Sequence, residues 1–122
     1  MSRDLYERAV AISERAYAPY SNYFVGAAVR TRDGKVFEGV NVENAAYPLG
    51  ICAEKAALAM AVSEGYKPGD IEAIGITASP CGGCRQWLYE FRIGEVTFLN
   101  SAGELATYSA AELLPDTWDL PA

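Results

Sequence analysis

The cysteines and the absence of histidine constrain this chain most. Its 122 residues hold three cysteines and no histidine, so chemistry that needs an imidazole is excluded within the chain. Cys52 opens the segment Cys-Ala-Glu, and the other two belong to Pro80-Cys81-Gly82-Gly83-Cys84. Both segments follow a loop or strand and begin a predicted helix. Because a helix N-terminus stabilises negative charge, we expect all three thiols to have lowered pKa values.

Three thiolates at such positions suit a zinc ion. A structural zinc site has four protein ligands, whereas three ligands leave one position for water, which is the catalytic pattern. Bound zinc lowers the pKa of that water toward about 7. Glu54 lies two residues after Cys52, and from the first turn of a helix its carboxylate can carry protons between water and substrate.

Two other classes of protein stay open from the cysteines alone. A Cys-x-x-Cys pair can be a thioredoxin-like redox site, although two intervening glycines, a third cysteine and Glu54 disfavour that interpretation. A structural zinc module could also be completed by a ligand from a partner chain. A disulfide framework is disfavoured by the small, odd number of cysteines.

Composition and net charge limit the classes of partner that this chain can bind. Hydrophobic residues make up 51% of the chain, which predicts a globular protein, and we expect residues 1–122 to form one domain. The net charge of −6 argues against nucleic acid and against anionic membrane surfaces. The charged N-terminal residues lack the apolar core of a signal peptide, so a cytoplasmic location is expected.

Periodicity and turn residues predict a mixed sheet. Arg32-Asp33-Gly34 is typical of a hairpin turn, and Ser109 with Glu112 forms a capping box before a short last helix. The order of elements predicts an α/β fold with a mixed five-stranded sheet sandwiched between helices. The expected helices are 4–17, 52–64 and about 80–91, and the expected strands are 23–31, 35–42, 71–78, 95–99 and 105–108, with a loop at 43–51.

Beyond the cysteines, most of residues 10–119 resembles a known family. The arrangement of a ligand, any residue, Glu and then Pro-Cys-x-x-Cys is that of zinc deaminases. Further similar segments are YSNYFVGAAV (20–29), GVNVENAAYPLGICAEKAAL (39–58), AVSEGYK (61–67), SPCGGCRQWLYEF (79–91) and ELLPDTW (112–118). Together these segments resemble the small homotetrameric cytidine deaminases.

The resemblance implies a three-layer α/β/α fold, one zinc ion per subunit, and hydrolysis of cytidine and deoxycytidine to uridine and deoxyuridine with release of ammonia, a step of pyrimidine salvage. It also implies a small nucleoside substrate and a homotetramer with shared sites. The stretch before Ser79 is shorter than usual in the family. A deaminase of a modified cytosine nucleoside or a related small molecule is therefore the alternative.

The resemblance assigns roles position by position. Cys52, Cys81 and Cys84 match the zinc ligands, and Glu54 matches the proton shuttle. The matches to substrate-binding positions are Asn41 and Glu43 for the ribose 3′-hydroxyl, the backbone of Ala53 and Ser79 for the edge of the base, Tyr23 for stacking on the base, and Tyr47, Leu49 and Trp118 for a neighbouring subunit's site. Tyr17, Tyr20, Tyr66 and Phe91 are expected to serve packing.

Three of these positions depart from the family's usual residues. Tyr23 and Trp118 each stand where phenylalanine is usual. Lys55 stands where the family usually has an arginine that donates to the thiolates. Lysine keeps the positive charge but lacks arginine's planar fork. We therefore expect Lys55 to offset the charge of the metal cluster without arginine's bidentate hydrogen bonding.

Overall fold

The computed structural model describes residues 2–119. Its helices are α1 (Arg3–Ser13), α2 (Ala53–Ser63), α3 (Gly82–Glu90) and α4 (Ala110–Leu113), with a 3-10 turn, η1 (Tyr47–Leu49). Its strands are β1 (Gly26–Thr31), β2 (Val36–Val40), β3 (Ile71–Ile76), β4 (Glu95–Leu99) and β5 (Leu105–Tyr108). No helix among residues 2–119 is long and apolar enough to cross a membrane.

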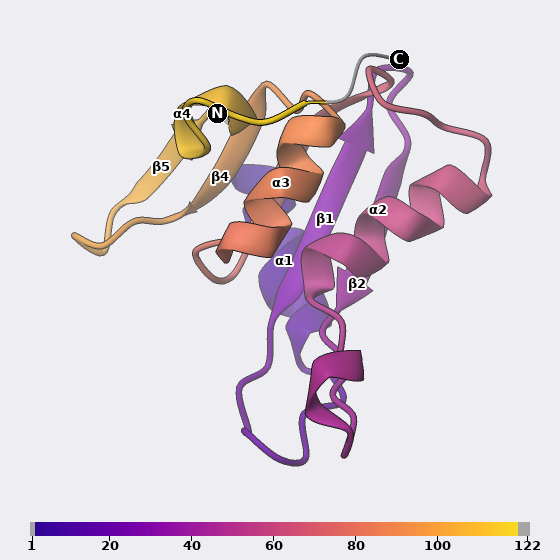
Figure 1. Cartoon of the computed structure of the whole chain (residues 1–122), viewed down its shortest axis with the longest axis vertical. Coiled ribbons are helices and arrows are strands. Elements are labelled where there is room, and N and C mark those ends of the chain that lie inside the picture. The colour runs from indigo at the N-terminus through magenta and orange to yellow at the C-terminus, as the bar shows by residue number, and fades with distance from the viewer. Residues whose placement is uncertain (1, 120–122) are drawn as a thin grey trace.

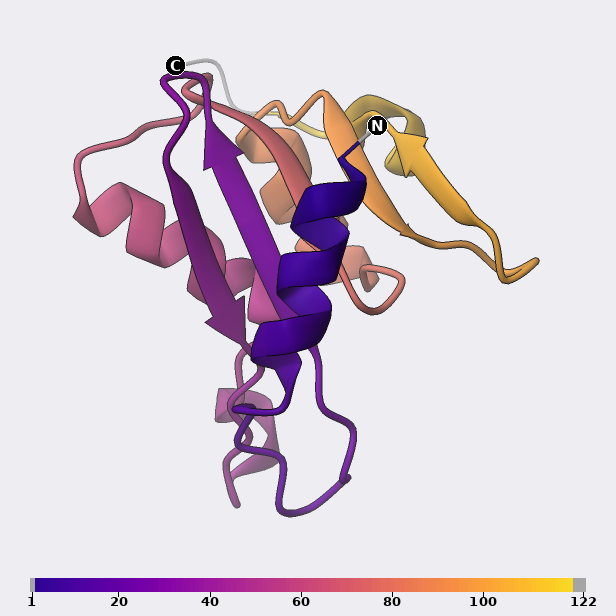
Figure 2. The same ribbon diagram turned by 180° about the vertical axis from the view of Figure 1, so that it is seen from behind.

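The strands form one mixed sheet in the order β2-β1-β3-β4-β5. The β3–β4 pair is parallel and the other three pairs are antiparallel. Helices α2 and α3 lie on one face (Figure 1), and α1 crosses the other face (Figure 2). The predicted α/β fold with a mixed five-stranded sheet between helical layers is confirmed.

Strand alternation places the core on both faces of the sheet. In β1, Val29 packs with Leu58 of α2 and Leu88 of α3, whereas its neighbour Ala28 packs with Leu5 of α1. All five of these side chains are fully buried. The larger part of the core therefore lies between the sheet and the helices α2 and α3.

Glycines in the strands allow the helices to approach the sheet backbone. A Cβ on Gly39 of β2 would lie 2.4 Å from the Ala57 nitrogen of α2, and a Cβ on Gly75 of β3 would lie 2.4 Å from the Tyr6 nitrogen of α1. No side chain fits at either distance. The position of α2 along β2 is thereby fixed, and with it the position of Cys52 at the start of α2.

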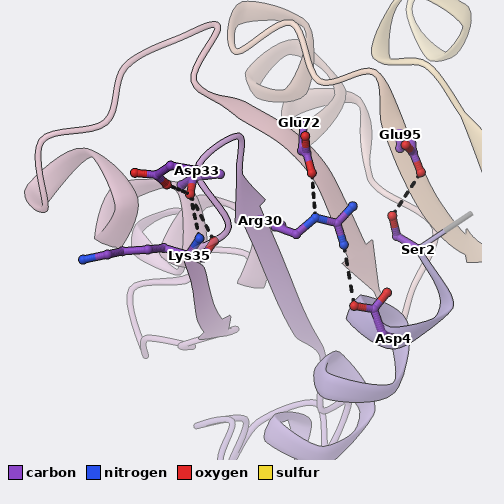
Figure 3. Close-up of polar contacts among 8 residues, drawn as sticks. Ser2, Asp4, Arg30, Asp33, Lys35, Glu72 and Glu95 are labelled. Carbon is purple, nitrogen blue, oxygen red and sulfur yellow. Dashed lines mark hydrogen bonds and ion pairs between the residues drawn. The ribbon is translucent and has the colours of Figure 1, made fainter.

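Polar contacts hold α1 on its face of the sheet (Figure 3). Arg30 of β1 donates from Nε to Glu72 of β3 at 2.7 Å, and its Nη1 lies 3.6 Å from Asp4 of α1. The Ser2 hydroxyl donates to Glu95 of β4 at 3.1 Å. These contacts join the N-terminal end of α1 to β1 and β4, and they join β1 to β3.

The predicted element order and the bounds of β4 and β5 are confirmed, as are the hairpin turn, with Gly34 at a φ of +94°, and the Ser109–Glu112 capping box. Several other boundaries, such as the ends of β2 and β3, differ from the prediction by one or two residues, and two are wrong by more. The first helix ends at Ser13 instead of residue 17, because Tyr17 pairs with Val42 in an isolated β-bridge. The strand predicted from residue 23 begins at Gly26, because the preceding residues form a loop bonded to Asn41 and Glu43.

We expect Gly75→Ala to lower the free energy of unfolding by about 1–3 kcal/mol, because the new methyl group would meet backbone atoms of α1. Gly94→Ala is the matched control, since its Cβ would have no neighbour closer than 4.0 Å. Urea unfolding followed by circular dichroism measures both variants. Equal midpoints would show that α1 can move away from the sheet without cost.

Candidate metal centre and active site

The structure brings the three cysteine sulfurs within 4.8 Å of one another. Cys52 is the N-cap residue of α2, Cys81 is the N-cap residue of α3, and Cys84 lies within the first turn of α3. The Cys84 amide donates to the Cys81 sulfur at 3.4 Å. The sequence placed all three at helix starts, and the fold adds that the two helix starts meet at one point.

This donor set fits zinc. Sulfur–zinc bonds are about 2.3 Å long, so thiolates that share an ion must lie as close together as these do. Soft thiolate ligands also select zinc over hard cations such as magnesium. Cys52, Cys81 and Cys84 would hold the ion, and among residues 2–119 no other His, Cys, Asp or Glu joins this cluster.

The expectation of a lowered pKa at every thiol is wrong for two of the three. Burial raises the pKa of Cys84, and the neighbouring charge of Glu54 raises it further. Burial also raises the pKa of Cys52. For Cys81, burial acts upward, but the hydrogen bond from the Cys84 amide and contacts with the other two sulfurs leave its pKa lowered. Ionising all three thiols together therefore calls for a cation between them.

Glu54 lies in the first turn of α2 and is 4% exposed. Burial raises the pKa of its carboxyl, while contact with Cys84 and the charge of Lys55 act in the opposite direction. A carboxyl with a raised pKa can both accept and release a proton near neutral pH. Glu54 is therefore suited to acid–base work beside the thiols.

A cavity of about 550 Å³ adjoins the cluster. Glu54, Cys52 and Cys81 line it. So do the predicted substrate contacts Tyr23, Asn41, Glu43, Tyr47, Ala53 and Ser79. The volume suits a small molecule. The sequence could not show that strand ends and loops so far apart in the chain would share one cavity.

Four predicted positions lie outside the lining of this cavity among the described residues: the metal ligand Cys84, and Leu49, Lys55 and Trp118. Leu49 and Trp118 are 69% and 73% exposed. The Lys55 Nζ lies 5.9 Å from the centre of the Trp87 ring, a cation–π arrangement. The structure thus places the Lys55 ammonium against Trp87 of α3, and Leu49 and Trp118 on the surface.

Asn41 and Glu43 hold the loop that precedes β1. Asn41 donates from Nδ2 to the Tyr23 carbonyl at 2.9 Å and accepts from the Val25 amide at 2.8 Å. Glu43 accepts hydrogen bonds from the Tyr20 and Ser21 amides and from the Ser21 hydroxyl. These two side chains therefore have structural partners as well as positions on the cavity wall.

Sequence reasoning missed the functional position of this loop. Tyr20 was expected to serve packing, but it is 62% exposed and lines the cavity together with Ser21. Asn22 has a φ of +59°, and asparagine tolerates this left-handed conformation. The Pro19–Asn22 stretch is rich in turn residues, and that was the available signal for a loop.

Arg85 was also missed. Its guanidinium donates to the Pro80 carbonyl at 2.8 Å, to the Ser79 hydroxyl at 3.3 Å and to the Leu113 carbonyl at 3.2 Å. It therefore joins the segment before Cys81 to the end of α4.

A buried carboxyl beside three convergent thiols, at the wall of a small-molecule cavity, defines a class of zinc hydrolase site. The profile of the family described as "Cytidine and deoxycytidylate deaminase zinc-binding region" matches residues 1–100. The chain belongs to this family, and zinc is its cofactor.

Relatives and solved structures agree with that assignment. The chain is 41% identical to the cytidine deaminase of Halalkalibacterium halodurans, over 91% of this chain and 89% of the relative. It is 45% identical to a probable cytidine deaminase of Dictyostelium discoideum, over 82% and 71%. The crystal structure of cytidine deaminase from Burkholderia pseudomallei superposes with a TM-score of 0.88 at 46% identity, covering 97% of this chain and 99% of that one.

We expect dialysed protein to retain one zinc ion per chain and Cys81→Ser to lose most of it, because a serine hydroxyl is a far poorer zinc ligand than a thiolate. Cys81 is exposed, so its replacement leaves the core intact. Gly82→Ala is the control, since nothing lies within 4 Å of its new methyl group. Atomic emission spectroscopy measures the zinc content per chain. One zinc ion per chain in Cys81→Ser would contradict the assigned ligand set.

Proposed function

We propose that this protein is a cytidine deaminase, which converts cytidine and deoxycytidine with water into uridine and deoxyuridine and releases ammonia. The observation that carries the proposal is the buried Glu54 carboxyl, which lies beside the thiol cluster and lines a cavity of nucleoside size. The relatives named as cytidine deaminases support the same substrate class.

The chain's own residues divide the chemistry between them. Cys52, Cys81 and Cys84 hold zinc, which when bound supplies Lewis-acid activation of water. Glu54 takes one proton from the attacking water and delivers it to N3 of the pyrimidine, and then carries the second proton, from the oxygen now bonded to C4, to the departing amino group. The new bond joins the water oxygen to C4, and the bond from C4 to the amino nitrogen breaks.

The remaining cavity residues bind the nucleoside. Asn41 and Glu43 hold the ribose 3′-hydroxyl, and Tyr23 stacks on the base. The backbone of Ala53 and Ser79 binds the edge of the pyrimidine. Their common position around one cavity supports this division into a sugar end and a base end.

Lys55 offsets the charge of the cluster, because zinc with three thiolates carries a net negative charge. A Cβ at Gly83 would lie 3.9 Å from the Lys55 Nζ and 4.0 Å from the Cys81 sulfur, so the ammonium and the thiol flank the same glycine. The Trp87 ring of α3 holds the ammonium through a cation–π interaction.

A deaminase of a modified cytosine nucleoside is the second candidate. Only residues 77–80 connect β3 to Cys81, and Ser79 is exposed. The base end of the cavity therefore has little covering chain on this side. Comparing deamination of cytidine with that of 5-substituted cytidines, by loss of absorbance, distinguishes the two candidates.

Either reaction belongs to pyrimidine salvage in the cytoplasm, and the net charge of −6 disfavours nucleic acid as substrate.

We expect Glu54→Gln to lower kcat by about 10²–10⁴-fold or more, because the amide cannot carry protons. Glu64→Gln, at the exposed end of the same helix, is the control and should match the wild type. Zinc content and thermal unfolding confirm that the variant is folded and loaded. Turnover near the wild-type rate in zinc-loaded Glu54→Gln would leave the proposed mechanism without its proton carrier.

The active form in this proposal is a homotetramer with sites shared between subunits. Large apolar side chains stand in solvent on one chain: Tyr47 is 90% exposed, and Leu49 and Trp118 are also largely exposed. Side chains of this kind commonly mark a surface that a partner covers. Tyr47 also lines the cavity, so a partner at this surface would lie next to the substrate.

We expect sedimentation velocity to show a tetramer for the wild type and smaller species for Leu49→Asp, because a charge would be buried in the interface. Deamination should fall together with the tetramer fraction. Leu99→Asp is the control, since Leu99 is also partly exposed but lies on β4. A fully active monomer would overturn the shared-site arrangement.

A further inference from the structure

We propose that Ser21 is a positioning residue of the nucleoside site, whose hydroxyl orients the Glu43 carboxylate toward the sugar and links it to the loop that carries Tyr23. The inference rests on the proposed function, because it takes the sugar to be the group that Glu43 binds. Ser21 is thereby added to the residues that bind or orient the nucleoside.

Among the hydrogen bonds of residues 2–119, the Glu43 carboxylate has one acceptor position left for a ligand. A carboxylate offers about four lone-pair positions. Its Oε1 accepts from the Tyr20 amide at 3.0 Å and from the Ser21 amide at 3.2 Å, and its Oε2 accepts from the Ser21 hydroxyl. Both positions on Oε1 are therefore filled, and Oε2 retains one. Because Glu43 lines the cavity, a substrate hydroxyl can reach that remaining position.

The Ser21 hydroxyl is the link between the sugar-binding side chain and the base-binding side chain. It donates to Glu43 and accepts from the Tyr23 amide at 3.0 Å. Its hydrogen bond is also the main cause that lowers the pKa of Glu43, so the carboxyl is held as a charged acceptor. A single hydroxyl therefore sets the direction of the group that meets the sugar and favours its charged form.

Tyr23 has a second support that does not depend on Ser21. Asn41 donates to the Tyr23 carbonyl and accepts from the Val25 amide. Removing the Ser21 hydroxyl should therefore leave the stacking ring near its place and release mainly Oε2 of Glu43. This separation makes the inference testable with substrates that differ only in the sugar.

The experiment compares cytidine with 2′,3′-dideoxycytidine, which lacks the 2′- and 3′-hydroxyls, in the zinc-loaded enzyme. We expect Ser21→Ala to raise KM for cytidine about tenfold, as loss of a hydrogen bond to a charged group does, with kcat within about twofold of wild type. For the dideoxy substrate kcat/KM should be unchanged. Ser21→Thr, which keeps the hydroxyl, should restore the KM for cytidine.

Ser63→Ala is the matched control, since the Ser63 hydroxyl donates to the Ala59 carbonyl at 3.0 Å at the exposed end of α2. Calorimetric Kd values for uridine and 2′,3′-dideoxyuridine give a readout independent of turnover, and only the first should weaken in Ser21→Ala.

Equal losses for both sugars would overturn the inference, because Ser21 would then serve the loop alone. An unchanged KM for cytidine would overturn it as well. A wild-type protein that binds zinc but does not deaminate cytidine would instead refute the proposed function, and this inference with it.

Discussion

Two helix N-termini that meet at one point are the constraint on which the rest of the site depends. Cys52 begins α2 and Cys81 begins α3, and their sulfurs lie with that of Cys84 within 4.8 Å. Burial and mutual proximity raise the pKa values of two of these thiols, so the cluster is costly to ionise without a cation. The packing of two helices on one sheet face thus determines both the shape of the cluster and its need for zinc.

The same packing supplies the cavity. Helix α2 lies directly on β2 at Gly39, so the chain that leaves β2 passes beside the start of α2. Asn41 and Glu43 lie on that segment, and Ser79 lies on the short connection after β3. Side chains for a ligand therefore come from segments just outside the sheet, while the core residues fix where those segments begin. Hydrogen bonds that Asn41 and Glu43 accept and Arg85 donates then fix the segments themselves.

Local signals in the sequence predicted what local physics determines. The bounds of β4 and β5, the turn at Gly34 and the Ser109–Glu112 cap each depend on a few adjacent residues. The end of α1 could not be predicted in this way, because Tyr17 leaves the helical pattern to pair with Val42, far along the chain. The prediction of lowered thiol pKa values failed for a related reason. At Cys52 and Cys84, burial raises the pKa by more than the helix N-terminus lowers it, and the sequence does not show burial.

For the site, the residue types were evident from motifs, but their partners were not. Glu43 accepts hydrogen bonds from a loop more than twenty positions earlier, and Arg85 donates to the Leu113 carbonyl. Under the proposed function, the bond from Ser21 to Glu43 joins the sugar end of the cavity and the loop of Tyr23 into one connected unit, and Arg85 holds Ser79 at the base end. Tyr47 extends that unit to the surface, because it lines the cavity and is 90% exposed. A partner subunit that covers Tyr47 would therefore alter the cavity wall directly, and assembly and substrate binding would be coupled through one side chain.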